Sequence, residues 1–308
     1  AGSYNLLDKT LRVPIKSGQK KLNFYEQRVV VHELVHSLQG MHFEVSEWYQ
    51  EMDDLDDFSN YPGIRALMEA QAEWVEAKWI DSLDAYDRQT MQAQIPNISC
   101  RVQLPNYFYI PSDLYYTYGP ILSREIINKG KMAALNEALG EYKRTGLTNL
   151  PTSEQIYSSE KYFANERYDV IEIADVEIGN FELIDEGTIG SLDIVYLLQD
   201  TIGPIPAITA AVGIGGGSWK DYVDPSGNLV MTVKISGDTS ADLDEIYDAY
   251  ILWGDTQKRF TEVVEQYNGL IYKGSTNVWI SKQNGFVKMV LSQDLKIIDE
   301  ISSQLGDL

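Results

Sequence analysis

Residues 24–38, FYEQRVVVHELVHSL, determine how the first half of this chain folds. Apolar residues recur in this stretch at the three-to-four-residue period of an α-helix, namely at Val29, Val30, Leu34, Val35 and Leu38. Gly40 follows, and glycine commonly ends a helix. We therefore predict a helix over residues 24–38, on which His32 and His36 lie one turn apart on the same face.

The pentapeptide His32-Glu33-Leu34-Val35-His36 has the spacing of a zinc site. Two histidines at positions i and i+4 direct their ring nitrogens at one point, and the carboxylate between them reaches a water held by the shared ion. Glu33 would take the proton of that water as a general base. All three histidines of the chain, His32, His36 and His42, fall within eleven residues, which favours a metal site over the polar edge of an amphipathic helix.

The third zinc ligand has two candidates. Glu69 follows His36 by 33 positions and lies on the next predicted helix, where Glu73, one turn later, could hydrogen-bond the far nitrogen of a ligand histidine. Alternatively His42, six positions after His36, would complete a metzincin-like site, but that motif requires glycine where this chain has Gln39. We favour Glu69 and assign His42 a helix-terminal or supporting place.

Longer blocks resemble a largely uncharacterised family of bacterial and archaeal zinc metallopeptidases. Its chains typically read HELTHALQDQHFDL and then LVEGDA, where this chain has VHELVHSLQGMHFEV at residues 31–45 and ALMEAQA at residues 66–72. The resemblance implies a gluzincin-like, thermolysin-type zincin with Glu69 as the acidic ligand. Ala70 and Gln71 depart from the family pattern, which usually has glycine and an acidic residue there. The chain also lacks the glycine-rich exopeptidase signature, which favours an endopeptidase.

Gluzincins commonly add a tyrosine or histidine that donates a hydrogen bond to the oxyanion. Since no histidine remains beyond His42, we expect a tyrosine to have this role and select Tyr116 and Tyr118. With twenty tyrosines in the chain, packing in the core or at the surface is the competing interpretation for both.

The element pattern predicts an α+β protein of two domains, 1–168 and 169–308. The first is expected to be a mainly helical, zincin-like domain with a hairpin at 4–7 and 10–14, and helices at 24–38, 62–83, 112–128, 131–142 and after the capping-box sequence at 151–154. The second is expected to be a smaller antiparallel α+β domain with helices at 189–201, 204–212, 241–267 and 295–305, strands at 229–235, 270–273, 277–281 and 287–291, and a loop at the glycine-rich residues 213–217.

Composition limits the partners. The formal charge of −21, from 46 acidic and 25 basic residues, disfavours nucleic acid and anionic membranes. No apolar run is long enough to insert in a membrane, and Cys100 stands alone, so no intramolecular disulfide forms. Calcium at the acidic stretch 53–57 is a weaker expectation than zinc. The chain begins Ala-Gly-Ser, so we expect a trimmed precursor at an extracellular or cell-surface location.

Two functions are consistent with these patterns, and neither fixes an oligomeric state. The first is a zinc endopeptidase that acts on a protein or peptide substrate. The alternative is a non-catalytic module in which the zinc is structural and the second domain binds a surface or envelope partner.

Overall fold

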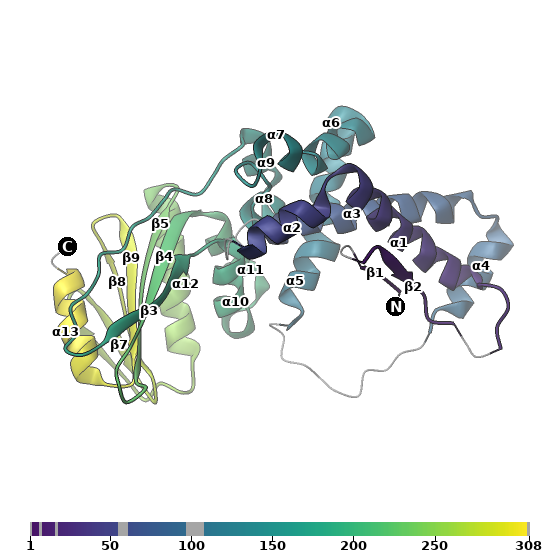
Figure 1. Cartoon of the computed structure of the whole chain (residues 1–308). Helices are drawn as coiled ribbons and strands as arrows, with labels where there is room; N and C mark the ends of the chain where they lie inside the picture. The colour runs from purple at the N-terminus through teal and green to yellow at the C-terminus, as the bar shows by residue number, and fades with distance from the viewer. Residues whose placement is uncertain (1, 6–7, 16–17, 55–60, 97–107, 307–308) are drawn as a thin grey trace. The chain divides into compact units, whose positions relative to one another are not determined.

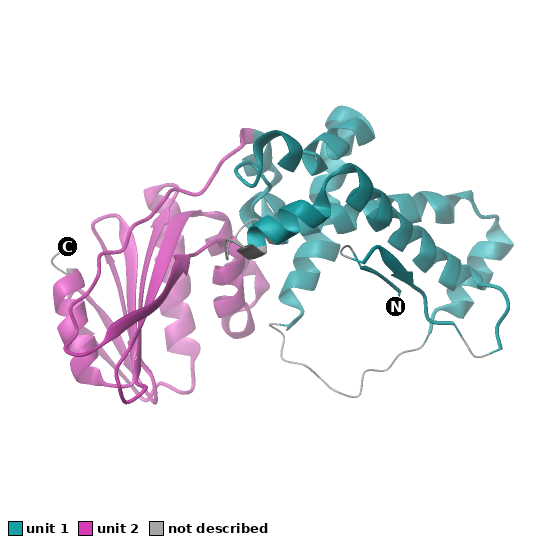
Figure 2. Ribbon diagram, in the orientation of Figure 1, with its two compact units in different colours: residues 1–163 teal, residues 164–308 magenta. Residues whose placement is uncertain are grey.

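The computed structural model describes residues 2–5, 8–15, 18–54, 61–96 and 108–306, and divides the chain into two compact units, residues 1–163 and 164–308 (Figure 2). The α+β class is confirmed. The expected boundary after residue 168 falls five residues inside the second unit. Residues 55–57 of the acidic stretch considered for calcium, and Cys100, lie outside the described residues. Among the described helices, none is long and apolar enough to span a membrane.

The first unit is mostly helical (Figure 1). Its elements are β1 (Ser3–Asn5), β2 (Thr10–Arg12), α1 (Phe24–His42), α2 (Val45–Asp54), α3 (Tyr61–Ser82), α4 (Ala85–Gln94), α5 (Ile110–Asp113), the π-helix η2 (Leu114–Tyr118), α6 (Gly119–Leu139), α7 (Tyr142–Thr145), α8 (Ser153–Tyr157) and α9 (Ser159–Ala164). Strands β1 and β2 form the predicted antiparallel hairpin. Helix α3 packs against α1 on one side and against η2 and α6 on the other, so it occupies the centre of this unit.

A capping box formed by Asn23 and Glu26 defines the start of helix α1. The Asn23 side chain accepts from the backbone N–H of Glu26, and the Glu26 carboxylate accepts from the backbone N–H of Asn23, which satisfies two N–H groups at the helix start. The helix continues to His42, past the predicted end at residue 38, because Gly40 is tolerated within a helix at a modest cost in stability.

Helices α2 and α4 were not predicted. Helix α2 has an apolar face, formed by the buried residues Val45, Trp48 and Met52, that the sequence analysis did not use, whereas α4 is polar and buries only Met91 among its described residues. The predicted break between residues 128 and 131 is confirmed, because Gly130 and Lys131 have non-helical backbone angles and form a kink that divides α6. The predicted helix 112–128 contains the π-helix η2, whose wider turn changes the direction of the side chains that follow.

The second unit is built on one antiparallel sheet of seven strands, in the order β3-β4-β5-β9-β8-β7-β6. The strands are β3 (Glu182–Thr188), β4 (Ile214–Val223), β5 (Leu229–Gly237), β6 (Glu262–Gln266), β7 (Gly269–Lys273), β8 (Asn277–Gln283) and β9 (Phe286–Ser292). The helices are α10 (Ser191–Ile202), α11 (Pro204–Val212), α12 (Ser240–Thr256) and α13 (Leu295–Gly306). Helices α12 and α13 lie on opposite faces of the sheet (Figure 1).

Two predictions in this unit were wrong. Of the glycine-rich residues 213–217, predicted as a loop, 214–217 form the start of β4. A β-carbon on Gly216 would come within 2.3 Å of the Asp169 carbonyl oxygen, so only glycine allows this close approach. The predicted helix 241–267 ends at Thr256, and the β-branched pair Val263 and Val264 belongs to the edge strand β6. Strand β3, at the other edge, was not predicted.

Candidate metal centre

Helices α1 and α3 bring three potential ligand atoms to one point. His32 Nε2 lies 3.2 Å from His36 Nε2 and 3.2 Å from Glu69 Oε2, and His36 Nε2 lies 3.4 Å from the same carboxylate oxygen. Ligands bound tetrahedrally to zinc at about 2.0–2.1 Å stand about 3.3 Å from one another. The three separations therefore match the first coordination shell of a zinc ion, with one position left for water.

The hydrogen bonds of His36 determine which ring nitrogen carries its proton. The Gln39 amide nitrogen donates to the Met68 carbonyl oxygen at 2.9 Å, so the Gln39 amide oxygen must face His36 Nδ1, 2.8 Å away. An amide oxygen only accepts, so His36 Nδ1 carries the proton and Nε2 presents a lone pair. Gln39 also donates to Gln71, which donates to Asn136, and this amide chain fixes the His36 ring across α1, α3 and α6.

His32 is oriented by a carboxylate. Its Nδ1 atom lies 3.3 Å from Glu76 Oε2, and the other oxygen of Glu76 forms an ion pair with Arg28 at 3.1 Å. The carboxylate accepts from Nδ1, which leaves Nε2 with a free lone pair, as in the carboxylate–histidine pairs of known zinc sites. This place was predicted for Glu73, and Glu76, three residues later, occupies it instead. The seven positions from Glu69 to Glu76 complete about two helical turns and return to the same face.

Glu69 is the most buried member of the site, with 1% of its surface exposed. Its Oε1 atom accepts from Arg65 Nε at 2.9 Å and from Arg65 Nη2 at 2.8 Å, which leaves Oε2 for the histidines. Burial alone would raise the pKa of Glu69, but the hydrogen bonds to His32 and His36 outweigh it and hold the pKa far below its usual range. Burial likewise opposes protonation of His32, yet Glu69 and Glu76 raise its pKa to about 9.

The chemistry of this donor set fits a zinc ion. With both Nδ1 atoms protonated, two imidazole nitrogens and a carboxylate oxygen face one another within 3.4 Å, an arrangement that repels unless a proton or a metal cation lies between them. Two imidazole nitrogens with one carboxylate oxygen are also the ligands of thermolysin-type zinc sites. Within the described residues, His32, His36 and Glu69 form such a group, whereas His42 is exposed in the last turn of α1.

The remaining predicted site residues lie at different places. Glu33, 8% exposed, is flanked by the two ligand histidines on α1. Tyr116 reaches Glu69, and burial together with the charge and hydrogen bond of Glu69 raises its pKa, so its hydroxyl stays protonated. The Tyr118 ring instead packs edge-on against Tyr157, with centroids 4.9 Å apart. Tyr116, and not Tyr118, is therefore placed beside the ligand group.

Sequence reasoning missed the residues that support the ligands, namely Arg28, Gln39, Arg65, Gln71 and Glu76. A helical-spacing signal was present for several of them. Arg65 precedes Glu69 by four positions, Glu76 follows it by seven, and Gln39 follows His36 by three. Such spacings are common on any helix, and only the packing of α1 on α3 distinguishes these residues from their neighbours.

Compared with protein-family models, with curated proteins and with solved structures, this chain matches none. The resemblance of residues 31–45 and 66–72 therefore stays a prediction, and the geometry of the site has to support any assignment.

Proposed function

We propose that this protein is a zinc-dependent endopeptidase with the ligands His32, His36 and Glu69. One observation carries the proposal: the two Nε2 atoms and Glu69 Oε2 converge at 3.2–3.4 Å while hydrogen bonds on the far side of both rings fix their tautomers. A structural zinc site would normally be closed by a fourth protein ligand. Among the described residues the group has three, which favours an open position for water and hence catalysis.

A bound zinc ion would supply Lewis acidity, polarising a carbonyl group and acidifying a water molecule. Glu33 would then accept the proton from that water and return it to the leaving amine, because a residue between two histidines at i and i+4 is on the flank of the helical turn that carries them. The Tyr116 hydroxyl, held protonated beside Glu69, would donate a hydrogen bond to the oxygen that gains charge in the transition state.

The hairpin favours a peptide as substrate. Strand β1 packs against α1, and the β-carbon position of Gly2 lies 3.4 Å from Glu33 Cγ, so the strand runs beside the proposed general base. Strand β1 pairs with β2 over Ser3–Asn5, and an extended peptide would lie along this hairpin. Backbone hydrogen bonds to a free strand edge bind peptides of varied sequence. An extracellular or cell-surface location agrees with such a substrate and stays a proposal.

Glu33→Gln is the decisive variant, because glutamine keeps the size of the side chain but cannot accept the proton. The zinc-loaded variant should retain the metal and the melting temperature of the wild type and lose cleavage of a panel of unfolded proteins, while Glu160→Gln, at an exposed position of α9, should cleave normally. Cleavage by the wild type should stop with a chelator and return with zinc. Equal behaviour of wild type and Glu33→Gln would instead favour the non-catalytic binding module.

A further inference from the structure

Two lysines stand directly opposite each other in the sheet of the second unit. Lys234 on β5 is the cross-strand partner of Lys288 on β9. Like charges in this position destabilise a sheet, and burial of an ammonium group adds a further penalty unless the charge is neutralised. Lys288 is 4% exposed, and burial, followed by the charge of Lys234, lowers its pKa. The arrangement is costly in a chain whose carboxylates far outnumber its lysines and arginines.

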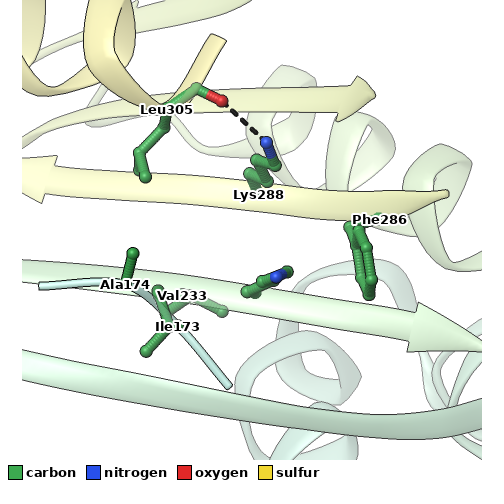
Figure 3. A pocket seen from close by; sticks show the side chains of 7 residues that line it. Ile173, Ala174, Val233, Phe286, Lys288 and Leu305 are labelled. Carbon is green, nitrogen blue, oxygen red and sulfur yellow. Dashed lines mark hydrogen bonds between the residues drawn. The ribbon is translucent and has the colours of Figure 1, made fainter. Parts of the chain in front are cut away.

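Each lysine is only partly satisfied by the protein. Lys288 Nζ donates to the Leu305 carbonyl oxygen at the end of α13 at 2.7 Å (Figure 3), and Lys234 Nζ donates to the Glu172 carbonyl oxygen at 3.0 Å. Lys234 Nζ also lies 4.3 Å from the centroid of the Phe286 ring. An ammonium group has three N–H donors, so two remain on each lysine. Neither lysine forms an ion pair with a carboxylate in the described part of the chain.

A lysine on the same face shows the usual solution. Lys220 and Tyr222 are two residues apart on β4, so their side chains point to the same face of the sheet, and Tyr222 belongs to the core beneath α13. Val230 also belongs to this core and is four residues from Lys234 on β5, so Lys234 points to this face as well. Lys220 forms ion pairs with Asp175 and with Glu186, the latter at 3.3 Å. Among the described residues, carboxylates therefore lie against Lys220 on this face and against neither Lys234 nor Lys288.

A small cavity adjoins the lysine pair. Its volume is about 50 Å³, and the apolar residues Ile173, Ala174, Val233, Phe286 and Leu305 line it together with Lys234 and Lys288. Figure 3 shows Lys288 and these apolar residues. A single water needs roughly 10–15 Å³ of such volume, so the cavity has room for several waters or for one ion of the size of sulfate. Apart from the carbonyl oxygens that already accept from the lysines, the walls offer apolar side chains and two cations, which suits an anion better than a metal ion.

Two buried serine hydroxyl groups lie in the same cross-strand row of the sheet as the two lysines. Ser218 is the cross-strand partner of Lys234, and Ser281 is the cross-strand partner of Lys288, so the four residues cross β4, β5, β9 and β8 in line. The Oγ atoms of both serines are buried and have no hydrogen-bond partner within the described residues. Buried hydroxyl groups are normally satisfied, so the row has donors to spare on both sides of the lysine pair.

We propose that Lys234 and Lys288 bind a small inorganic oxyanion of the sulfate or phosphate type in this cavity. The anion would neutralise two facing cations and accept from their free N–H groups. This site belongs to the second unit and is independent of the metal centre and of the proposed peptidase activity.

Sulfate is the suitable probe, because phosphate also binds zinc ions. Calorimetric titration of sodium sulfate into the metal-free full chain, at an ionic strength kept constant with sodium chloride, should show one site per chain. Lys234→Met and Lys288→Met should each weaken sulfate binding at least tenfold. Lys282→Met, which removes a lysine of β8 that is ion-paired with Asp244, should leave it unchanged.

Melting temperatures give a second measurement that does not depend on the binding assay. In chloride, Lys234→Met should melt at or above the wild-type temperature, because it removes the facing charge; in sulfate, the wild type should gain stability and the variant should not. Asp307→Asn tests whether the carboxylate that follows α13 in the sequence neutralises the pair instead. A wild type without a sulfate-specific gain, a gain retained by both lysine variants, or a gain created by Asp307→Asn would overturn the proposal.

Discussion

Replacing Gln39 by methionine should weaken zinc binding although Gln39 is not a ligand. The side chain is 1% exposed and makes three hydrogen bonds, to His36, to the Met68 carbonyl and to Gln71. Methionine keeps the volume and loses all three, so His36 can adopt the tautomer with the proton on Nε2, which cannot bind a metal. Loss of such a supporting residue costs roughly 10- to 100-fold in metal affinity, about 1.4–2.8 kcal/mol.

The same substitution lowers folding stability, so affinity and stability have to be separated. Two buried oxygens, on Met68 and Gln71, lose a donor, and each loss costs about 1–3 kcal/mol. Gln39→Glu would also lose both donated bonds but would keep an acceptor for His36. It should therefore bind zinc more tightly than Gln39→Met while being no more stable.

Competition with a chromophoric chelator measures the zinc affinity of each variant, and circular dichroism reports whether it is folded. Gln27→Met is the matched control, since Gln27 lies on the same helix and donates to the Leu22 carbonyl away from the ligands. A folded Gln39→Met variant with wild-type zinc affinity, or a Gln39→Glu variant that binds more weakly than it, would refute the assignment of the His36 tautomer.

Three further predictions follow from individual contacts. Arg65→Met removes both donors from Glu69 Oε1 and should lower zinc affinity about tenfold in the same chelator assay, whereas unchanged affinity would contradict the positioning of Glu69 by Arg65. In the metal-free protein the folded-state pKa of His32 is raised to about 9 from 6.5, so its contribution to stability is complete below pH 6.5 and is lost as the pH rises through 9. The melting temperature should fall over that range in the wild type and not in His32→Gln. Gly63→Ala should destabilise the first unit by about 3 kcal/mol in urea unfolding, because its β-carbon would lie 1.9 Å from the Pro151 carbonyl oxygen. Replacing glycine by alanine also stabilises a folded chain by up to about 1 kcal/mol through the unfolded state. A net loss of stability below about 1 kcal/mol would therefore show that the segment around Pro151 moves away from the new methyl group.

The parts of the fold that sequence predicts are those governed by local chemistry. The periodicity of residues 24–38 defines α1, and the capping box of Thr152 and Gln155 starts α8, as the reciprocal hydrogen bonds between their side chains and backbones confirm. The facing of His32 and His36 follows from the helix alone. The contact of both histidines with Glu69 does not follow from one helix, because it depends on how α3 packs on α1. The sequence limited the third ligand to two candidates, Glu69 and His42, but did not decide between them.

The features that sequence does not predict involve packing between distant segments. The glycines at 213–217 suggest a loop by their intrinsic preferences, yet the close approach of residue 169 turns them into a strand that tolerates no side chain at Gly216. Likewise, nothing local distinguishes Glu73 from Glu76 as the partner of His32. Which of the two carboxylates reaches His32 depends on the face of α3 that packs on α1. A rotation of α3 about its axis by one residue, about 100°, would bring a different carboxylate to His32.

The charges around the ligand group make a divalent cation the natural occupant. Four carboxylates, of Glu33, Glu69, Glu73 and Glu76, and two guanidinium groups, of Arg28 and Arg65, leave a formal charge of −2. The pKa of Glu73 is raised, first by burial and then by the charge of Glu76, which is the sign expected where negative charge is in excess. A zinc ion would cancel this excess, whereas a single proton on His32 would cancel only half of it.

This balance also explains why a neutral residue suits position 71, where the sequence pattern that residues 66–72 resemble usually has an acid. Gln71 accepts from Gln39 and donates to Asn136. A carboxylate could accept from Gln39 and from a turned Asn136 amide, but it would take the formal charge beyond what one divalent ion neutralises. The amide therefore preserves the support of His36 without adding charge.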